Sequence, residues 1–133
     1  MSRALTLLAV LVLLSAVSLS WASVTITSPA AGSTVGPSTV VTGAASQRAF
    51  LVVYSDVFAG EESLGMVPGI RHWTNDDDSY NVRISTPRLY LRAGEQATQL
   101  TYIIHVKAYT AAPRNASASP DLGEATVTVY SAQ

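Results

Sequence analysis

The side chains best suited to acid–base or metal chemistry are few in this chain. It contains two histidines, His72 and His105, and no cysteine, which excludes thiolate metal ligands and cysteine nucleophiles. The Gly-x-Ser-x-Gly turn that exposes a nucleophilic serine is absent as well. We expect His72, beside Trp73, to pack or lie at the surface, and His105 to face solvent or a partner. The sequence therefore predicts a protein that is not an enzyme and uses no cofactor.

The densest acidic cluster is Asp76-Asp77-Asp78. A hard cation such as calcium takes about six to eight oxygen ligands, so a distant carboxylate such as Glu61, Glu62 or Asp56 would have to complete a site there. The spaced ligand pattern of a helix–loop–helix calcium site is absent. An exposed polar turn between two strands explains the same residues more simply, and calcium is the weaker interpretation.

Arginine and aromatic side chains offer a recognition surface instead. Arg71 and Trp73 are predicted to share one face of a strand, beside the aspartate cluster. A flat indole flanked by hydrogen-bonding groups can stack on a sugar ring or anchor a protein partner. The simpler interpretation is that Trp73 lies in the core with Arg71 over it, because a small domain with a single tryptophan usually buries it. Tyr109 and Tyr130 are the other candidate platforms for binding.

Short alternating runs of apolar and polar residues, separated by turn-forming residues, dominate the chain after residue 22. Such runs are typical of half-buried β-strands, and the spacing of an amphipathic helix is missing. About seven short strands with turn signals between them favour a sandwich of two antiparallel sheets. The predicted strands are Val24–Thr27, Thr39–Gly43, Ala49–Tyr54, Met66–Trp73, Tyr80–Ser85, Leu100–Tyr109 and Glu124–Tyr130.

The alternation also predicts which side chains enter the core, because successive residues of a strand point to opposite faces. The segment Phe50-Leu51-Val52-Val53-Tyr54 is an exception, since it is apolar on both faces. We expect one of its faces in the core and the other under a loop or against a partner. The predicted inward side chains are Tyr80, Val82, Ile84, Tyr102, Ile104, Val106, Ala108, Ala125, Val127 and Val129, and the outward ones of the sixth strand are Ile103, His105, Lys107 and Tyr109.

The first residues of the chain predict export. Arg3 precedes the apolar run Ala4–Leu14, and Ser20-Trp21-Ala22 places small residues at positions −3 and −1 of a cleavage site. The apolar run is shorter than the roughly 20 residues needed to span a bilayer. We therefore expect Met1–Ala22 to be a cleaved signal peptide and residues 23–133 to form a single secreted domain that does not insert into a membrane.

Charge and modification signals narrow the set of partners. The chain has 8 basic and 9 acidic residues, for a formal net charge of −1, so it lacks the electrostatic footprint of a nucleic-acid-binding or membrane-binding protein. Asn115-Ala116-Ser117 is an N-glycosylation sequon in a polar, proline-flanked segment. Asn115 is thus a glycosylation candidate if the source is eukaryotic, and the sequon has no meaning if the source is bacterial.

Two stretches resemble a known family. The segment Ile26-Thr27-Ser28-Pro29-Ala30-Ala31-Gly32-Ser33-Thr34-Val35, followed by Val40-Val41-Thr42-Gly43-Ala44, resembles the opening of secreted immunoglobulin-like domains in bacterial and fungal surface proteins. The alternation Tyr102-x-Ile104-x-Val106-x-Ala108 is similar to the penultimate strand of fibronectin type III domains. The resemblance implies an immunoglobulin-like antiparallel β-sandwich and a role in binding, and it assigns no site residues.

We therefore expect a small non-catalytic binding protein, an extracellular effector or adhesion-type module that recognises a protein partner. The alternative is a carbohydrate-binding or cell-wall-associated module that stacks sugar rings on Trp73 and the tyrosines named above. Solvent exposure discriminates between the two. Trp73 coplanar with a tyrosine on an open sheet face would favour a sugar. An exposed aliphatic patch around Val57, Phe58 and Leu64 would favour a protein.

Overall fold

The computed structural model describes residues 24–87, 99–115 and 118–132. These residues form β-strands and no helix, so the prediction of an all-β protein is confirmed. The predicted signal peptide lies outside the described residues, as do residues 116 and 117 of the sequon. No helix in the described ranges is long and apolar enough to cross a membrane.

The described residues form one strand more than the sequence predicts. Each predicted strand is present, with ends that differ by a few residues, and Leu100–Tyr109 has the predicted bounds. The largest extensions affect the third and fourth predicted strands, which together form one long hairpin. The strands are β1 (Val24–Ser28), β2 (Thr34–Val35), β3 (Ser38–Ala45), β4 (Phe50–Ala59), β5 (Glu62–Trp73), β6 (Ser79–Ser85), β7 (Leu100–Tyr109) and β8 (Glu124–Ser131).

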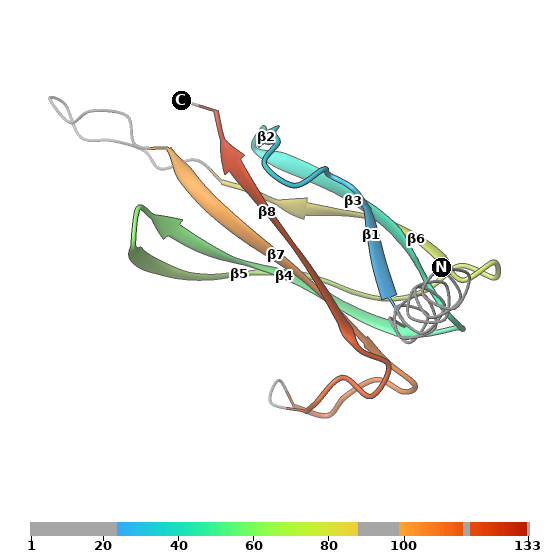
Figure 1. The fold of residues 1–133 in the computed structure, drawn as a ribbon. Helices are drawn as coiled ribbons and strands as arrows, with labels where there is room; N and C mark the ends of the chain where they lie inside the picture. Colours follow the sequence, from blue (N-terminus) through green and yellow to red (C-terminus); the bar gives the residue numbers. More distant parts are fainter. Residues whose placement is uncertain (1–23, 88–98, 116–117, 133) are drawn as a thin grey trace, which may run out of the picture.

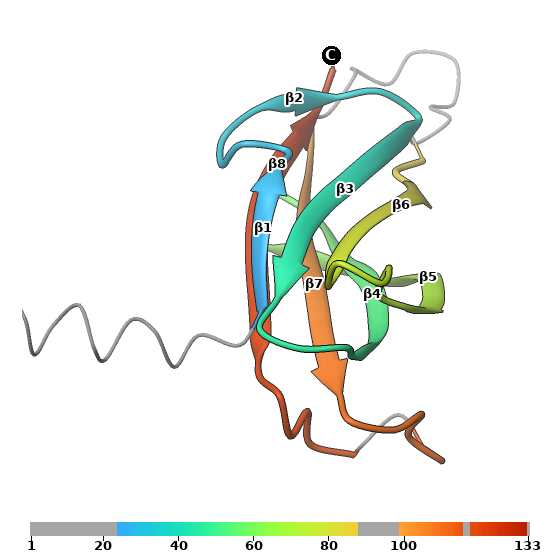
Figure 2. The same cartoon turned by 90° about the vertical axis from the view of Figure 1, so that its right-hand side faces the viewer.

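The strands form two sheets that lie face to face (Figure 1). One sheet has the order β1-β3-β6, and the other has the order β2-β8-β7-β4-β5. All neighbouring strands are antiparallel except β2, which runs parallel to β8. The sheets also contact each other at their sides, where β5 approaches β6 and β1 approaches β8 (Figure 2). The result is a β-sandwich-like fold.

The core lies between the two sheets and contains the side chains that the alternation predicts. On β7 the predicted inward side chains are fully buried, and the outward ones before Tyr109 are half-buried. β6 and β8 follow the same rule, with Ala125 half-buried. The buried core includes Val24, Val41, Leu51, Val53, Val57, Tyr80, Val82, Ile84, Leu100, Tyr102, Ile104, Val106, Ala108, Val127 and Val129.

The N-terminal segment changes sheets between β1 and β2. β1 pairs with β3, and after the turn that contains Gly32 the chain pairs with β8 in the other sheet. The amide of Gly32 donates a 2.8 Å hydrogen bond to the carbonyl of Thr128, and the amide of Tyr130 donates a 3.0 Å bond to the carbonyl of Ser33. Gly32 has a φ of 80°, which suits glycine because it has no Cβ. One short segment thereby joins both sheets.

A bulge interrupts the pairing of β5 with β4. Val53 is paired with Ile70 while Ser55 is paired with Val67, so Pro68 and Gly69 together lie opposite a single residue of β4. A Cβ on Gly69 would lie 2.0 Å from the carbonyl oxygen of Val53. Only glycine allows the two backbones to approach this closely, and the bulge shapes the surface described below.

Candidate functional site

The outer face of the five-stranded sheet, which points away from the three-stranded sheet, carries the candidate site. On β4 its residues are Phe50, Val52 and Tyr54, and each is half-buried. Cross-strand partners share a face, so the register places Arg71 and Lys107 on either side of Val52. This face of β4 is therefore bordered by long cationic side chains from β5 and β7.

A groove with a volume of about 270 Å³ opens on this face. Its floor comes from β4, its sides come from the bulged part of β5 and from β7, and one end is formed by the loop between β7 and β8. Most of the lining is apolar or aromatic, and Arg71 and Lys107 are its charged groups. The lining residues are Val52, Val53, Tyr54, Met66, Pro68, Gly69, Ile70, Arg71, Lys107, Tyr109, Pro113 and Asn115.

The β7–β8 loop covers part of the outer face. Arg71 donates a 2.8 Å hydrogen bond from Nη2 to the carbonyl of Pro113, and the hydroxyl of Tyr109 donates a 3.0 Å bond to the carbonyl of Ala118. Tyr109 points outward, as predicted, but it is only 5% exposed because this loop lies over it. Tyr109 therefore serves as a wall of the groove, and its ring is not an open stacking platform.

The loop is closed at its base by a carboxylate. Asp121 accepts a 3.0 Å hydrogen bond from the amide of Thr110 through Oδ1 and a second bond from the hydroxyl of the same residue through Oδ2. These bonds hold the pKa of Asp121 below its usual value, and the bond from the Thr110 side chain has the largest effect. The ends of the loop are thus fixed next to the sheet, which keeps Pro113 in place above the groove.

Aromatic rings hold the two cations of the groove. The ammonium of Lys107 lies 5.2 Å from the ring centroid of Tyr54, and the guanidinium carbon of Arg71 lies 5.5 Å from that of Phe50. Both distances are within the range of cation–π contacts. A hydrogen bond with Tyr54 is the main reason that the pKa of Lys107 lies above its ordinary value, although partial burial opposes it. Lys107 is therefore protonated at neutral pH.

A second polar cluster lies next to the groove and links three strands. The ring of His105 on β7 stacks on Tyr54, with centroids 4.7 Å apart. Its Nε2 lies 2.8 Å from Oδ2 of Asp56 on β4, and its Nδ1 lies 2.7 Å from Oε1 of Glu124 on β8. Each ring nitrogen thus contacts a carboxylate oxygen, so His105 joins β4 to β8 through its side chain. The predicted solvent-facing histidine is instead held between two carboxylates.

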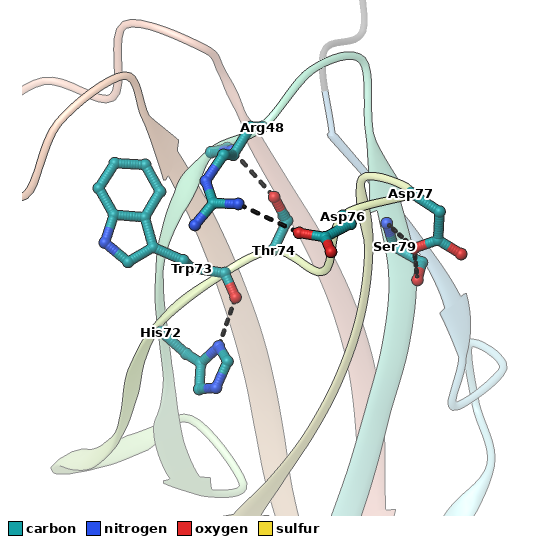
Figure 3. A network of polar contacts seen from close by, with 8 residues as sticks. Arg48, His72, Trp73, Thr74, Asp76, Asp77 and Ser79 are labelled. Carbon is teal, nitrogen blue, oxygen red and sulfur yellow. Dashed lines mark hydrogen bonds and ion pairs between the residues drawn. The ribbon is translucent and has the colours of Figure 1, made fainter.

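Trp73 lies on the outer face at the end of β5 and is 37% exposed, so it belongs to the surface and not to the core. Its ring meets Phe50 edge-on, with centroids 5.4 Å apart. The guanidinium carbon of Arg48 lies 5.5 Å from the indole centroid, and its Nη1 lies 3.4 Å from Oδ1 of Asp76. Figure 3 shows Arg48 between Trp73 and Asp76. His72 points to the other side of the strand and donates from Nδ1 to the carbonyl of Trp73.

The aspartate cluster forms a turn between β5 and β6. Asp77 accepts hydrogen bonds from the amide and the hydroxyl of Ser79 (Figure 3), which lower its pKa. Asp78 has a φ of 65°, a conformation found in tight turns. The described residues contain no group of three histidine or acidic side chains suited to a metal ion. Asp56, one proposed distant ligand, is instead bound to His105.

The four predicted binding residues do not gather at one place. Arg71, Trp73 and Tyr109 lie near the Phe50 end of β4, since Trp73 and Tyr109 are both partners of Phe50. Tyr130 is half-buried on the same face but pairs with Thr101 at the opposite end of the sheet. The separation along β4 is about 26 Å at roughly 3.3 Å per residue. Tyr130 is therefore not part of the groove.

Sequence reasoning misses several lining residues. It predicts Lys107 only as an outward-facing residue of its strand, and it assigns no role to Met66, Pro68 or Pro113. The available signal is the segment 50–54, whose second apolar face requires a cover. The structure supplies that cover with the β7–β8 loop and the bulged β5 strand. Asn115, the glycosylation candidate, is exposed in this loop and lines the groove.

Comparisons with models of protein families, with curated proteins and with solved structures found no match to this chain. The site is therefore interpreted from its own geometry.

Proposed function

We propose that this protein is a small secreted, non-catalytic binding module that recognises a protein partner through β5 and the adjoining outer face. One observation carries the proposal: Leu64, Met66 and Trp73, with exposures of 42%, 59% and 37%, are the large apolar side chains exposed among the described residues, and all belong to β5. Among the described strands, β5 lies at the edge of its sheet and pairs only with β4. These side chains are spread along β5, from the Phe58 end of β4 to the Phe50 end, and Met66 also lines the groove. Exposed apolar side chains along an edge strand are typical of a partner surface.

The exposed apolar patch differs from the one expected from the sequence. Val57 is buried, with 6% exposure, and Phe58 is half-buried, because both belong to β4 inside the sheet and not to a loop. Leu64 is exposed, and so is Met66; both belong to β5, the strand next to β4. Exposed aliphatic side chains, which favour a protein partner, are therefore present, but they lie on β5 and not on β4.

The strand order supports an immunoglobulin-like module. Constant-type domains of that kind place their first, second, fourth and fifth strands in one sheet and their third, sixth and seventh in the other. β1, β3 and β6 fit the first group, and β4, β7 and β8 fit the second. β5 lies beside β4 in the second sheet, the sheet to which variable-type domains add further strands. A tyrosine near the start of the penultimate strand typically bonds to the backbone upstream. Here Tyr102 on β7 donates its hydroxyl hydrogen to the carbonyl of Pro87.

Binding without catalysis agrees with the composition of the groove. Where the structure describes the chain, the groove lining contains no histidine and no carboxylate, the groups most often used as general bases. The polar side chains that do line it are long and cationic or aromatic, which suits recognition more than proton transfer. Secretion is part of the proposal and is supported by the leader-like residues 1–22.

Sugar binding is the second candidate, because the indole of Trp73 is partly open. Three observations make it the weaker one. Arg48 lies over the indole, the edge of Phe50 meets it, and the ring of Tyr109 is covered by the β7–β8 loop. Within the described residues, Trp73 therefore has no neighbouring tyrosine with which to form a flat stacking platform.

Binding of the fluorescently labelled protein to cells of the producing organism, measured by flow cytometry, tests the proposed function. The cells are assayed untreated, after limited proteolysis and after periodate oxidation of their glycans. We expect binding that is lost after proteolysis and kept after periodate. A variant with Leu64→Ser and Met66→Ser should bind at least tenfold more weakly, whereas Val40→Ser, on the outer side of the three-stranded sheet, should bind normally.

The same measurements can contradict the proposal. Binding that survives proteolysis but is lost after periodate, and that Trp73→Ala removes, would assign the protein to the sugar-binding class. Absence of binding in every condition, or equal binding by the double variant, would remove β5 as the recognition surface. Thermal unfolding of each variant checks that a loss of binding does not reflect a loss of fold.

A further inference from the structure

Val52 lies at the centre of a cross of four side chains on the outer face. Phe50 and Tyr54 are its neighbours along β4, and Arg71 on β5 and Lys107 on β7 are its register partners on either side. Adjacent strands are about 4.8 Å apart, so the Cα atoms of the two cations are separated by roughly 10 Å across an apolar floor. The guanidinium of Arg71 lies toward Phe50 and the ammonium of Lys107 lies toward Tyr54, on opposite sides of Val52. A group above Val52 can therefore contact both cations once the flexible Lys107 side chain turns toward it.

The two cations lack a carboxylate partner inside the groove. Among the described residues no acidic side chain lines it, and the ion pairs found there use Arg48 and His105 instead. Glu124 is the cross-strand neighbour of Lys107 and attracts its ammonium, but Glu124 does not line the groove and its Oε1 is bound to His105. An anion placed between the cations would relieve their mutual repulsion and gain attraction from both.

Arg71 is held in position while keeping donors for a ligand. Its one hydrogen bond within the described chain runs from Nη2 to Pro113, and a guanidinium carries five N–H donors. A planar guanidinium with free donors binds a carboxylate in a bidentate manner. Because Pro113 and the ring of Phe50 already fix the side chain, little conformational freedom is lost when a ligand binds.

The rest of the groove sets the size and polarity of the ligand. Met66, Pro68, Ile70 and Pro113 give apolar walls, so the anionic group must be attached to an apolar body. The volume of about 270 Å³ is below the roughly 300–1,000 Å³ of sites for drug-sized molecules. It suits one acidic side chain and the apolar residues next to it.

We propose that the groove binds an aspartate or glutamate side chain of an extended peptide segment, with the carboxylate between Arg71 and Lys107 above Val52. This inference rests on the proposed function, since the segment belongs to the protein partner that β5 recognises. An anionic polysaccharide shares the charge, but its hydroxyl groups would need hydrogen-bonding walls, and these walls are apolar. The acidic side chain thus acts as the central anchor, and Met66 and Pro68 contact its apolar neighbours.

Selection from a random library of displayed peptides, with the purified protein as bait, tests this inference even though the partner is not identified. We expect enriched peptides to share an aspartate or glutamate flanked by apolar residues. A synthetic peptide from this set should lose at least tenfold in affinity when its acidic residue is replaced by the matching amide. Its affinity should also fall as salt concentration rises, because charge attraction is screened by salt.

Protein variants locate the effect. Arg71→Gln and Lys107→Gln should each lower the affinity for the selected peptide about tenfold or more. Arg71→Lys should recover part of this affinity, because lysine restores the charge but cannot form the bidentate contact. Arg83→Gln is the matched control, since Arg83 is exposed on β6 of the other sheet and bonds to Ser38. It should leave the affinity unchanged. Thermal unfolding shows whether each variant keeps the fold.

The outcomes separate this inference from the proposed function. Two results would overturn the carboxylate site and leave the protein-binding function standing. One is enrichment of peptides that share no acidic residue. The other is an affinity for the selected peptide that is the same for Arg71→Gln, Lys107→Gln and the unchanged protein. Failure to enrich any peptide, together with Arg71-dependent binding of a defined oligogalacturonate, would overturn both. Failure of both probes to bind would also overturn the carboxylate site.

Discussion

The hydroxyl of Tyr80 occupies the space that a side chain at Gly43 would need. A Cβ at position 43 would lie 2.4 Å from the Tyr80 hydroxyl oxygen and 2.0 Å from the carbonyl oxygen of Thr25. That carbonyl accepts a 2.6 Å hydrogen bond from the same hydroxyl. Since β3 lies between β1 and β6, Tyr80 reaches from one edge of the sheet to the other across the bare backbone of Gly43.

Replacement of Gly43 by alanine should destabilise the fold by about 3 kcal/mol, because the added methyl group must displace buried Tyr80 or the β1 backbone. The matched control is Gly36→Ala, where nothing lies within 4 Å of the new Cβ; this change should be neutral or slightly stabilising. Chemical denaturation of both variants measures the difference. Equal midpoints for the two variants would contradict the close packing of Tyr80 over Gly43.

Ser55→Ala should stabilise the protein by about 1 kcal/mol. The hydroxyl oxygen of Ser55 is fully buried on β4 and has no hydrogen-bond partner within the described residues. An unpaired buried hydroxyl costs roughly 1–3 kcal/mol of stability, and alanine removes it with little change in volume. The free energy of unfolding in urea measures the gain. A loss of stability would show that the hydroxyl has a partner after all.

Thr86→Val should have the opposite effect and lower the free energy of unfolding by about 1–3 kcal/mol. The hydroxyl of Thr86 is paired with that of Thr39 at 2.9 Å and also donates to the carbonyl of Gly36. The substitution leaves these groups without their partner in a buried position. Measured beside Ser55→Ala under the same conditions, it separates the effect of pairing from the effect of burying a hydroxyl.

Acid should release the base of the β7–β8 loop through Asp121. Its carboxylate accepts both bonds from Thr110, so its folded-state pKa is lower than the ordinary value of an aspartate. The stabilisation is complete above about pH 4, the range of the unfolded carboxyl, and is lost as the pH falls through the lower folded-state pKa. The protection factor of the Thr110 amide against hydrogen exchange should therefore fall in strong acid.

Asp121→Asn provides the control for this pH effect, because the amide cannot ionise. The Thr110 amide of this variant should exchange faster than that of the unchanged protein at about pH 6, well above the pKa of an unfolded carboxyl, and its protection should not change further in acid. A protection factor in the unchanged protein that stays constant down to about pH 2, where an unfolded carboxyl is protonated, would argue against the bond between Thr110 and the carboxylate.

Tyr102→Phe should lower the free energy of unfolding by about 1–2 kcal/mol, because it removes a hydrogen bond to the backbone and leaves the carbonyl of Pro87 unpaired. Tyr130→Phe, on the half-buried outer face of β8, is the control and should change stability by less than about 0.5 kcal/mol. Thermal unfolding distinguishes the two. A negligible effect at Tyr102 would weaken the proposed immunoglobulin-like assignment, which relies in part on this contact.

The strands and their buried faces are predictable because alternation has a direct physical cause, the burial of every second side chain. β7 shows this best, with Ile104 and Val106 fully buried and His105 outward as predicted. β2 is not predictable, since Thr34–Val35 is too short to show a period. Its pairing with β8 depends on where the preceding turn directs the chain.

The site is predictable only in part, because its shape depends on contacts between distant segments. The predicted common face of Arg71 and Trp73 is confirmed by their register with Val52 and Phe50. The cover over Tyr109 arises from a loop, and the bulge at Gly69 arises from pairing with β4, and neither leaves a periodic signal in the sequence. The pairing of Asp56 with His105 likewise joins residues from separate strands.

The passage of the N-terminal segment between the sheets has a mechanical consequence. β2 is parallel to β8, so a pull applied to Val24 and Ser131 in opposite directions drags the two strands past each other along their length. The bonds that Gly32 and Tyr130 make across this contact are then loaded together instead of opening one after another. Such shear loading should make this short contact the point at which the domain resists tension between its ends.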